Sequence, residues 1–439
     1  LHRSDLLLQL MTSHEVLAIS GTHGKTTTTS LMIHLFKEAG WDPAFAVGGM
    51  MKGIEMNSSD GKGQYFVAEA DESDGTFLKY NYHSAIITNI DTDHLAHYGT
   101  WDNLVASFSQ FAKKAKTANR LFYCIDCPTL EKLKPQGISY GFSEKAELQG
   151  SHFRQDGFSV TFDASFQGKC YRDITVALTG YHNAQNALAV FGLALSLGLS
   201  EEKIRHGFAN FSGVKRRMDK KGQVTSISVF DDYAHHPTEI RATLSALRAA
   251  VKEKRIIAVY QPHRYSRMKY VMDELDGIFE QADCVVVTDL YSANEAPVAG
   301  VSTEQVIKNL QKSHVIPVLY IPRAQLVHQL HELLRPHDVV ITMGAGDITK
   351  VGGELVAELQ KRAPKKFRVG ILFGGMNCEH EVSCNSAKTF VKHLDPDLYD
   401  VHCFQIGLNG CFQKASNELQ PTSCNDSIIT PELFSELLL

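Results

Sequence analysis

The chain has 439 residues, about three times the length of a typical domain, and so predicts two or three domains. Hydrophobic residues make up 44% of the chain and charged residues 21%, a balance that suits a globular protein with ample material for buried cores. The formal net charge of −5 offers no basic surface for nucleic acid, and no apolar run approaches the roughly 18 residues of a membrane span. We therefore expect neither nucleic acid nor a membrane as a partner.

The nine cysteines are scattered and odd in number, which is typical of reduced thiols rather than a disulfide framework. Because the N-terminus also lacks a secretion signal, we expect a cytoplasmic protein. Cys124 and Cys127 form one CxxC pair, but no second pair completes a zinc site. A redox site needs such a pair at a helix start, which the local pattern does not predict, so we interpret both cysteines as structural.

A first unit is expected over residues 1–212. An apolar run at 16–20 predicts a buried parallel strand, and residues 26–39 predict a helix that ends at Gly40. Further elements in this unit are strands at 65–68 and 85–88, antiparallel strands at 158–162 and 174–178, and a helix at 183–197. Polar residues directly follow the strands at 65–68 and 85–88, where open α/β sheets place their sites.

A second unit is expected over residues 213–362, beginning with a hinge at 213–217. Alternating strands and helices predict a second, mostly parallel α/β domain. Its strands are expected at 226–230, 256–260, 284–288, 318–321 and 339–343, with helices such as 238–250 and 303–310 between them.

A basic linker at 363–366 leads to a strand at 367–373 and a helix from about Ser383, which predict the start of a third α/β domain over residues 365–439. The chain starts with Leu1 rather than Met. It also stops within an apparent amphipathic helix at 431–439, so we expect a fragment of a longer protein.

Residues 21–26, with the sequence GTHGKT, lie between a predicted strand and helix, the context that a phosphate-binding loop requires. Glycines let backbone amides converge on phosphate oxygens, and the helix N-terminus adds a favourable dipole. The loop departs from the general Walker pattern because Ile19 stands at the position of its first glycine. We predict nucleotide binding by this loop and the residue that follows it: Gly21, Thr22, His23, Gly24, Lys25, Thr26 and Thr27.

Lys25 would neutralise phosphate charge, and the Thr26 hydroxyl would face Mg²⁺. Glu69 ends a predicted strand, and one carboxylate there suffices for Mg²⁺, which keeps several waters. Taken alone, His94 after the next strand is more typical of a structural histidine, as is His97. The other acids of the loop after Glu69 are interpreted as solvated: Asp71, Glu72 and Asp74.

The sequence resembles the Mur ligase family, whose members use ATP to join an amino acid to a nucleotide-linked carboxylate. The motifs GTHGKTTTTS, AEADESD and TNIDTDH occur in this order, followed by GYHNAQNA at 180–187, the hinge Arg216-Arg217 and DDYAHHP at 231–237. The resemblance covers roughly residues 1–362 and implies a P-loop-type central ATP-binding domain followed by a Rossmann-like α/β domain.

Within the family, DDYAHHPTE and the QPHRYSR segment at 261–267 point to members that attach L-alanine to UDP-N-acetylmuramate. The implied reaction forms an acyl phosphate, which the amine of L-alanine attacks, in peptidoglycan precursor synthesis. One alternative is a recycling relative that attaches a preformed tripeptide, which shares the AHHP segment but typically lacks PHRYSR. A P-loop ATPase or kinase is the other alternative.

The resemblance also implies roles for single residues. The implied catalytic residues are Lys25, Glu69, His94 and Arg217, with Thr26, Glu69 and His94 as ligands of Mg²⁺. Further contacts to ATP are implied for Asn183, Asn186, Arg217 and Asp232. Substrate binding is implied for His235, His263, Arg264 and Arg267, the last three at the amino-acid carboxylate, for which arginine offers a matching fork.

The last segment resembles the start of the D-alanine–D-alanine ligase family. The resemblance rests on residues 366–375 and on CEHEVS at 378–383, and it implies that Glu381 orients the first D-alanine. The alternative for Glu381 is an acid favoured by the dipole at a helix N-terminus. The whole would join two steps of cell-wall peptide synthesis, with a separate domain that binds uridine diphosphate ahead of the phosphate loop.

Overall fold

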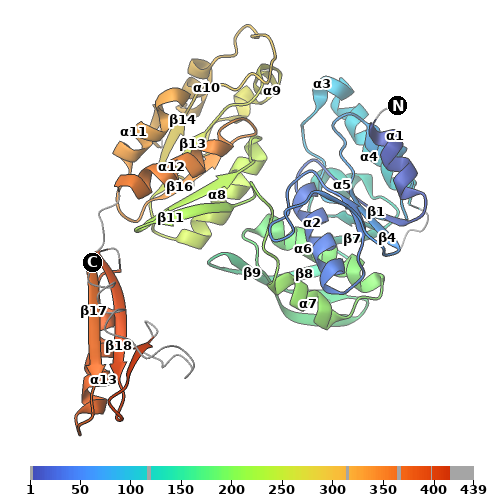
Figure 1. The fold of residues 1–439 in the computed structure, drawn as a ribbon. Helices are drawn as coiled ribbons and strands as arrows, with labels where there is room; N and C mark the ends of the chain where they lie inside the picture. The colour runs from blue at the N-terminus through green and yellow to red at the C-terminus, as the bar shows by residue number, and fades with distance from the viewer. Residues whose placement is uncertain (1–2, 116–119, 313–315, 363–366, 397, 416–439) are drawn as a thin grey trace. The chain divides into compact units, whose positions relative to one another are not determined.

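The structure, a computed structural model, describes residues 3–115, 120–312, 316–362, 367–396 and 398–415 (Figure 1). The linker at 363–366 and the helix expected at 431–439 lie outside these ranges. Contacts divide the chain into two compact units, one of residues 1–222 with 228–356 and one of 223–227 with 357–439. Within the described ranges, no helix is long and apolar enough to cross a membrane.

A ten-stranded sheet forms the first part of the chain, in the order β10-β9-β8-β7-β6-β5-β1-β4-β2-β3. Its parallel strands are β1 Glu15–Ser20, β2 Ala44–Ala46, β4 Tyr65–Glu69, β5 Ser84–Ile87, β6 Leu121–Cys124 and β7 Ile138–Gly141. β8 Leu148–Asp156 pairs parallel with β7, whereas β9 Ser159–Phe166, β10 Lys169–Val176 and the edge strand β3 Ser58–Asp60 pair antiparallel. The expected strands at 16–20, 65–68 and 85–88 and the antiparallel pair are confirmed.

The order of this sheet determines where a site forms. β1 lies between β4 and β5. After β1 the chain builds the sheet on one side, through β2 and β4, and then crosses to β5 on the other side of β1. Such a switch point opens a crevice at the carboxyl ends of parallel strands. The helices of this part are α1 Arg3–Met11, α2 Lys25–Glu38, α3 Leu95–Tyr98, α4 Trp101–Lys113, α5 Pro128–Leu133, α6 Tyr181–Ser196 and α7 Glu201–Ala209, with a 3₁₀ turn at Thr76–Lys79.

The expectation for the CxxC pair needs a correction. Cys127 is the N-cap of α5, because Pro128 favours the first helical position, so the pair does stand at a helix start. Both thiols are buried, and burial raises the pKa of Cys124 to about 12. Since the reactive form is the thiolate, the structural interpretation of this pair remains.

A six-stranded sheet follows, in the order β11-β12-β16-β13-β14-β15. Its strands are β11 Asp219–Val224, β12 Ile227–Asp232, β13 Ile256–Tyr260, β14 Cys284–Val287, β15 Val318–Tyr320 and β16 Val339–Met343. From β12 to β15 the pairs are parallel, which confirms the predicted second α/β domain. Its helices are α8 Pro237–Val251, α9 Tyr265–Val271, α10 Thr303–Leu310, α11 Leu326–Leu333 and α12 Thr349–Arg362, with 3₁₀ turns at Met272–Glu274 and Arg323–Gln325.

The last described segment forms a small α/β layer of its own (red in Figure 1). β17 Phe367–Gly374 pairs parallel with β18 Tyr399–Ile406 across the helix α13 His380–His393, and β19 Phe412–Ala415 pairs antiparallel with β18. The predicted strand and helix are confirmed, although α13 begins at His380 rather than near Ser383. Glu381 lies exposed in the first turn of α13.

Candidate functional site

A cleft of about 1210 Å³ lies at the carboxyl ends of β1, β4 and β5. The phosphate loop after β1, Glu69 at the end of β4 and His94 after β5 line it together with residues that follow β12 and β13. Most of the predicted site residues line this cleft: Thr22, His23, Gly24, Lys25, Thr26, Glu69, His94, Arg217, His235, His263, Arg264 and Arg267.

Asn89, one of the polar residues that follow the strand predicted at 85–88, fixes the backbone of the phosphate loop. Its Oδ1 accepts from the amide of His23 at 2.9 Å, and its Nδ2 donates to the carbonyl of His23 at 3.0 Å. Gly21 has φ of 134°, and a Cβ there would lie 2.0 Å from the Thr88 hydroxyl. Only glycine permits this close approach between the loop and the end of β5.

The ammonium of Lys25 is surrounded by backbone and carboxylate acceptors. Its ammonium donates to the carbonyls of Gly21 at 2.7 Å and Thr22 at 3.2 Å, and to Glu72 Oε2 at 2.7 Å. Asp71 Oδ1 lies 3.5 Å from the same nitrogen. The three protons of the ammonium therefore all have acceptors.

The interpretation of Glu72 as a solvated loop acid is wrong. Its side chain has no exposed surface. Ala70, two residues earlier, still extends the parallel pairing of β4 with β1, with its amide bonded to the carbonyl of Ile19 at 2.8 Å. Burial raises the pKa of Glu72 to about 7, although Lys25 opposes this shift. Nothing in the local sequence distinguishes Glu72 from its partly exposed neighbours, so only the fold shows that Glu72 is buried.

Thr26 and Glu69 bring two oxygen-bearing side chains together on the lining of the cleft. The Thr26 hydroxyl donates to Glu69 Oε1 at 3.0 Å, and the amide of Gly48 donates to Glu69 Oε2 at 2.6 Å. A hydroxyl and a carboxylate next to a phosphate loop fit Mg²⁺, which takes few protein oxygens together with phosphate oxygens.

His94 lies on the other side of Glu72. Its Nε2 is 3.5 Å from Glu72 Oε1 and 3.7 Å from Asp93 Oδ2. Burial lowers the pKa of His94 although Asp93 opposes the shift, so the ring is a neutral imidazole that can bind a metal. Glu72 Oε1 itself is buried and has no hydrogen-bond partner among the described residues.

The two asparagines expected at the nucleotide lie in the first turns of α6, next to the phosphate loop. Asn186 Nδ2 donates to Asn183 Oδ1 at 3.1 Å, and Asn183 Nδ2 donates to the carbonyl of Thr179 at 2.8 Å. A Cβ at Gly24, where φ is 85°, would lie 2.9 Å from Asn186 Oδ1. Gly24 thus allows α6 to approach the loop closely.

Asp232 is a predicted site residue that is not among those lining the cleft. Its carboxylate accepts from the amides of Met218 at 2.7 Å and Ala234 at 2.8 Å and is almost fully buried. Burial raises the pKa of Asp232 to about 6, although Arg217 opposes the shift. In this structure Asp232 therefore holds the chain around the hinge.

Arg267 and His263 form the centre of the predicted amino-acid site. Arg267 Nη1 lies 3.3 Å from His263 Nδ1, and Arg267 Nη2 lies 3.5 Å from Asp93 Oδ2. Burial, with Arg267 nearby, lowers the pKa of His263 to about 4, so its ring is neutral. The Nε of Arg267 is buried and has no hydrogen-bond partner among the described residues.

Arg264 differs from Arg267 because Glu295, a residue missed by the sequence analysis, holds it. Arg264 Nε donates to Glu295 Oε1 at 2.7 Å, and Glu295 also accepts from the amide and hydroxyl of Ser266. The ring of His263 stacks on Tyr291 at 5.6 Å. Glu295 therefore fixes the start of α9, from which Arg267 reaches the cleft.

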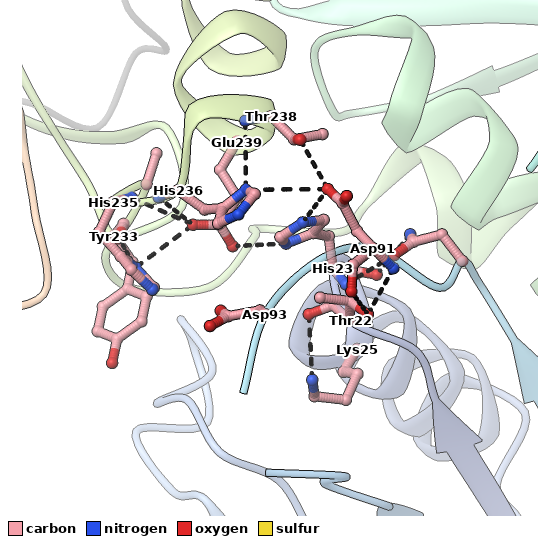
Figure 2. Close-up of polar contacts among 12 residues, drawn as sticks. Thr22, His23, Lys25, Asp91, Asp93, Tyr233, His235, His236, Thr238 and Glu239 are labelled. Atoms are coloured by element: carbon pink, nitrogen blue, oxygen red, sulfur yellow. Dashed lines mark hydrogen bonds and ion pairs between the residues drawn. The ribbon is translucent and has the colours of Figure 1, made fainter. Parts of the chain in front are cut away.

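The hinge arginines lie around one aromatic ring. The guanidinium of Arg216 is 4.7 Å and that of Arg217 is 5.1 Å from the centre of the Tyr233 ring. Arg217 Nη1 is also 4.0 Å from Glu239 Oε1. His23, in turn, places its ring between Asp91 and Glu239 (Figure 2). Asp91 is one of the polar residues expected after the strand at 85–88, whereas the sequence analysis gave Glu239 no role.

Fold and site together define an α/β protein with a phosphate-binding loop and a second α/β domain. Residues 19–194 match the Mur ligase middle domain, and residues 216–346 match the Mur ligase glutamate ligase domain. A UDP-N-acetylmuramate–L-alanine ligase from Protochlamydia amoebophila is 47% identical over 361 residues, which are 82% of this chain and 80% of that protein. The chain belongs to the Mur ligase family, which is ATP-dependent.

Residues 368–432 match a third family model, the D-ala D-ala ligase N-terminus. A bifunctional enzyme MurC/Ddl from Chlamydia caviae is 42% identical over 417 residues, which are 95% of this chain and 51% of that protein. The chain thus spans about half the length of this relative. Among solved structures, a UDP-N-acetylmuramate–alanine ligase from Thermotoga maritima gives a TM-score of 0.68 at 27% identity, covering 82% of this chain and 78% of that one.

Proposed function

We propose that this chain carries the centre of an ATP-dependent ligase that joins L-alanine to the carboxylate of UDP-N-acetylmuramate, giving ADP and phosphate. The observation that carries the proposal is that one cleft holds both Lys25 of a phosphate loop and the Arg267–His263 pair. The first suits a nucleotide phosphate and the second suits the carboxylate of a small amino acid. The names of the relatives support the same substrates.

The first step takes place on the phosphate side of the cleft. An oxygen of the muramate carboxylate attacks the γ-phosphorus of ATP, the bond to ADP breaks, and an acyl phosphate forms. The ammonium of Lys25 and the guanidinium of Arg217 offset the charge of the transferred group. Thr26, Glu69 and His94 are the residues that would hold Mg²⁺, which supplies further positive charge to the phosphates when bound.

The second step joins the two sides of the cleft. The carboxylate of L-alanine binds Arg267, whose Nε has no other partner among the described residues and whose Nη1 lies beside His263. The amine of L-alanine attacks the acyl carbon, loses a proton, and phosphate leaves. Holding both reactants in one cleft supplies much of the rate, because positioning converts a bimolecular step into an effectively unimolecular one.

Three parts of the proposal concern the whole protein. Residues 365–439 would begin a D-alanine–D-alanine ligase that uses D-alanine, as the name of the bifunctional relative suggests. Glu381 would lie at its first substrate, as the resemblance to that family implies. A further domain would bind the uridine diphosphate group. Both activities serve peptidoglycan precursor synthesis, which we place in the cytoplasm.

A panel of amino acids tests the proposal. UDP-N-acetylmuramate, ATP and Mg²⁺ are incubated with the chain, extended by the uridine-binding domain, and phosphate release is followed. We expect release that depends on L-alanine. Release without any amino acid would instead support an ATPase or kinase, and dependence on a tripeptide would support a recycling ligase.

A further inference from the structure

The first turn of α8 is bound directly to the phosphate loop. His23, in the middle of that loop, has its Nε2 2.9 Å from Asp91 Oδ2 and its Nδ1 3.2 Å from Glu239 Oε1 (Figure 2). The side chains of His23 and Glu239 are only 14% and 13% exposed. His23 therefore bridges a carboxylate that follows β5 and a carboxylate on α8.

Two further hydrogen bonds reinforce this bridge. The Thr238 hydroxyl donates to Asp91 Oδ2 at 2.6 Å, and His236 Nε2 lies 3.1 Å from the carbonyl of Thr92. Glu239 thus contacts the loop after β1, whereas Thr238 and the N-cap residue His236 contact the loop after β5. These are the two loops that place Lys25 and His94 in the cleft.

Glu239 extends the connection toward the predicted substrate residues. Its Oε2 accepts from the amides of His235 at 3.1 Å and His236 at 3.4 Å, which completes a capping box at the start of α8. The same oxygen lies 3.3 Å from His235 Nδ1. Through one carboxylate, the position of the phosphate loop is tied to His235, which lines the cleft, and to Arg217 at the hinge.

His23, Asp91 and His236 form a cluster whose hydrogen bonds favour a proton, rather than a metal ion, at its centre. One ligand atom each from His23, Asp91 and His236 lie within 4.8 Å of one another, a spacing that a metal ion tolerates. However, both ring nitrogens of His23 already face carboxylates, and His236 uses Nδ1 for the amide of Thr238 and Nε2 for Thr92. A protonated His23 between two carboxylates satisfies these groups.

We propose that His23 and Glu239 form a clasp that sets the distance between the phosphate loop and the amino-acid side of the cleft. Both are positioning residues for the second step, so the inference rests on the proposed function. The acyl phosphate forms next to Lys25, whereas the amine comes from an amino acid held by Arg267. A misplacement of about 1 Å between such groups costs on the order of 10²-fold in rate.

A double-mutant cycle tests the clasp. His23→Gln, Glu239→Gln and the double variant are compared with wild type, and Glu131→Gln, which removes one partner of an exposed ion pair with Lys145, is the matched control. We expect each single change to lower kcat by roughly 10–100-fold. The double variant should be no worse than the poorer single variant, with KM for ATP and for alanine nearly unchanged. Effects that multiply in the double variant, or that appear in KM alone, would overturn the clasp.

The same variants give a readout that does not need turnover. In the double variant, the loss in Tm should be smaller than the sum of the losses from His23→Gln and Glu239→Gln, because both changes break the same contact between His23 and Glu239. Additive losses would overturn the clasp, whereas absence of alanine-dependent turnover in wild type would instead count against the proposed function. If Glu239→Gln does not fold, Glu239→Asp replaces it, since this change keeps the carboxylate but shortens its reach to His23. Loss of wild-type Tm on adding a zinc chelator would identify a metal site and overturn the clasp.

Discussion

The ammonium of Lys25 and the carboxylate of Glu72 lie 2.7 Å apart, with side-chain exposures of only 10% and 0%. A phosphate that approaches the loop must therefore compete with a buried carboxylate for the same ammonium. Breaking a buried ion pair by removing one charge leaves the other uncompensated, which is strongly destabilising. The Lys25–Glu72 ion pair should therefore affect both the unfolding free energy of the nucleotide-free protein and its affinity for nucleotide.

The first prediction concerns Glu72→Gln, which removes the charge and keeps the shape. Without nucleotide, the variant should lose roughly 2 kcal/mol of unfolding free energy, because the buried Lys25 ammonium loses its charged hydrogen-bond partner and keeps Asp71 at 3.5 Å. ATP should then raise the Tm of the variant more than that of wild type, since phosphate supplies the missing charge. Thermal unfolding with and without ATP measures both effects. When Lys25→Ala is also present, Glu72→Gln should no longer increase the rise in Tm that ATP causes. An equal ATP-induced rise in Tm in wild type and in Glu72→Gln would show that Glu72 does not compete with phosphate.

The second prediction concerns Arg267→Ala. KM for alanine should rise about tenfold or more while KM for ATP stays nearly constant, because a carboxylate loses its charged hydrogen-bond partner. Initial rates at varied alanine and at varied ATP separate the two constants. Arg172→Ala, which changes an exposed arginine on β10, is the control and should behave as wild type. A parallel rise of both constants in Arg267→Ala would mean that this arginine does not select the amino acid.

The third prediction concerns the ligands expected for Mg²⁺. Glu69→Gln and His94→Ala should require more Mg²⁺ for half-maximal activity, and Mn²⁺, which accepts imidazole more readily, should support the wild-type His94 site better than the His94→Ala site. Metal titrations of activity measure these shifts, with folding followed by circular dichroism. Unchanged metal dependence in a folded variant would assign the residue a structural role.

The fourth prediction concerns pH. Burial alone lowers the pKa of His23, but hydrogen bonds to Asp91 and Glu239 and their charges outweigh it and raise the pKa from 6.5 to about 9. The stabilisation from protonated His23 is thus complete below pH 6.5 and is lost as pH rises through about 9. The other ionisable groups around the ring are Asp91 and Glu239, with His236 at 5.0 Å and Arg217 behind Glu239.

The difference in Tm between wild type and His23→Gln should therefore shrink between pH 6.5 and 9. Arg172→Ala should give a difference near zero throughout this range. A difference between wild type and His23→Gln that stays constant with pH would show that His23 is not charged in the clasp.

How far the sequence predicts the fold depends on the pattern of each element. β13, β16 and α10 have the predicted bounds. The two strands are compact apolar runs, and the helix has a strongly amphipathic pattern, so each element is distinct from the residues that flank it. The sequence does not predict β11, because DKKGQV is mostly polar. This strand lies at the edge of its sheet, next to β12. The start of α13 was placed too late because CEHE has no N-cap signal, and the structure shows no side-chain cap there.

The site divides in a similar way. The phosphate loop has a local signature that a sequence carries in full, so its strand, turn and helix were predictable. The partners of that loop are not local: Glu72 lies 47 positions from Lys25, and Glu239 lies 216 positions from His23. No spacing rule links such residues, and their importance follows only from burial and contact in the folded chain. Glu295 was missed for the same reason, since it acts on Arg264 from a separate loop.

The most direct test of the account follows an oxygen atom. UDP-N-acetylmuramate with ¹⁸O in its carboxylate is incubated with ATP, Mg²⁺ and L-alanine, and the released phosphate is examined by mass spectrometry. If the carboxylate attacks the γ-phosphorus within this cleft, each phosphate released with alanine present carries one ¹⁸O. Arg172→Ala should behave as wild type, and Lys25→Ala should release labelled phosphate at least about 10² times more slowly. Phosphate free of ¹⁸O would contradict the acyl phosphate and with it the proposed ligation.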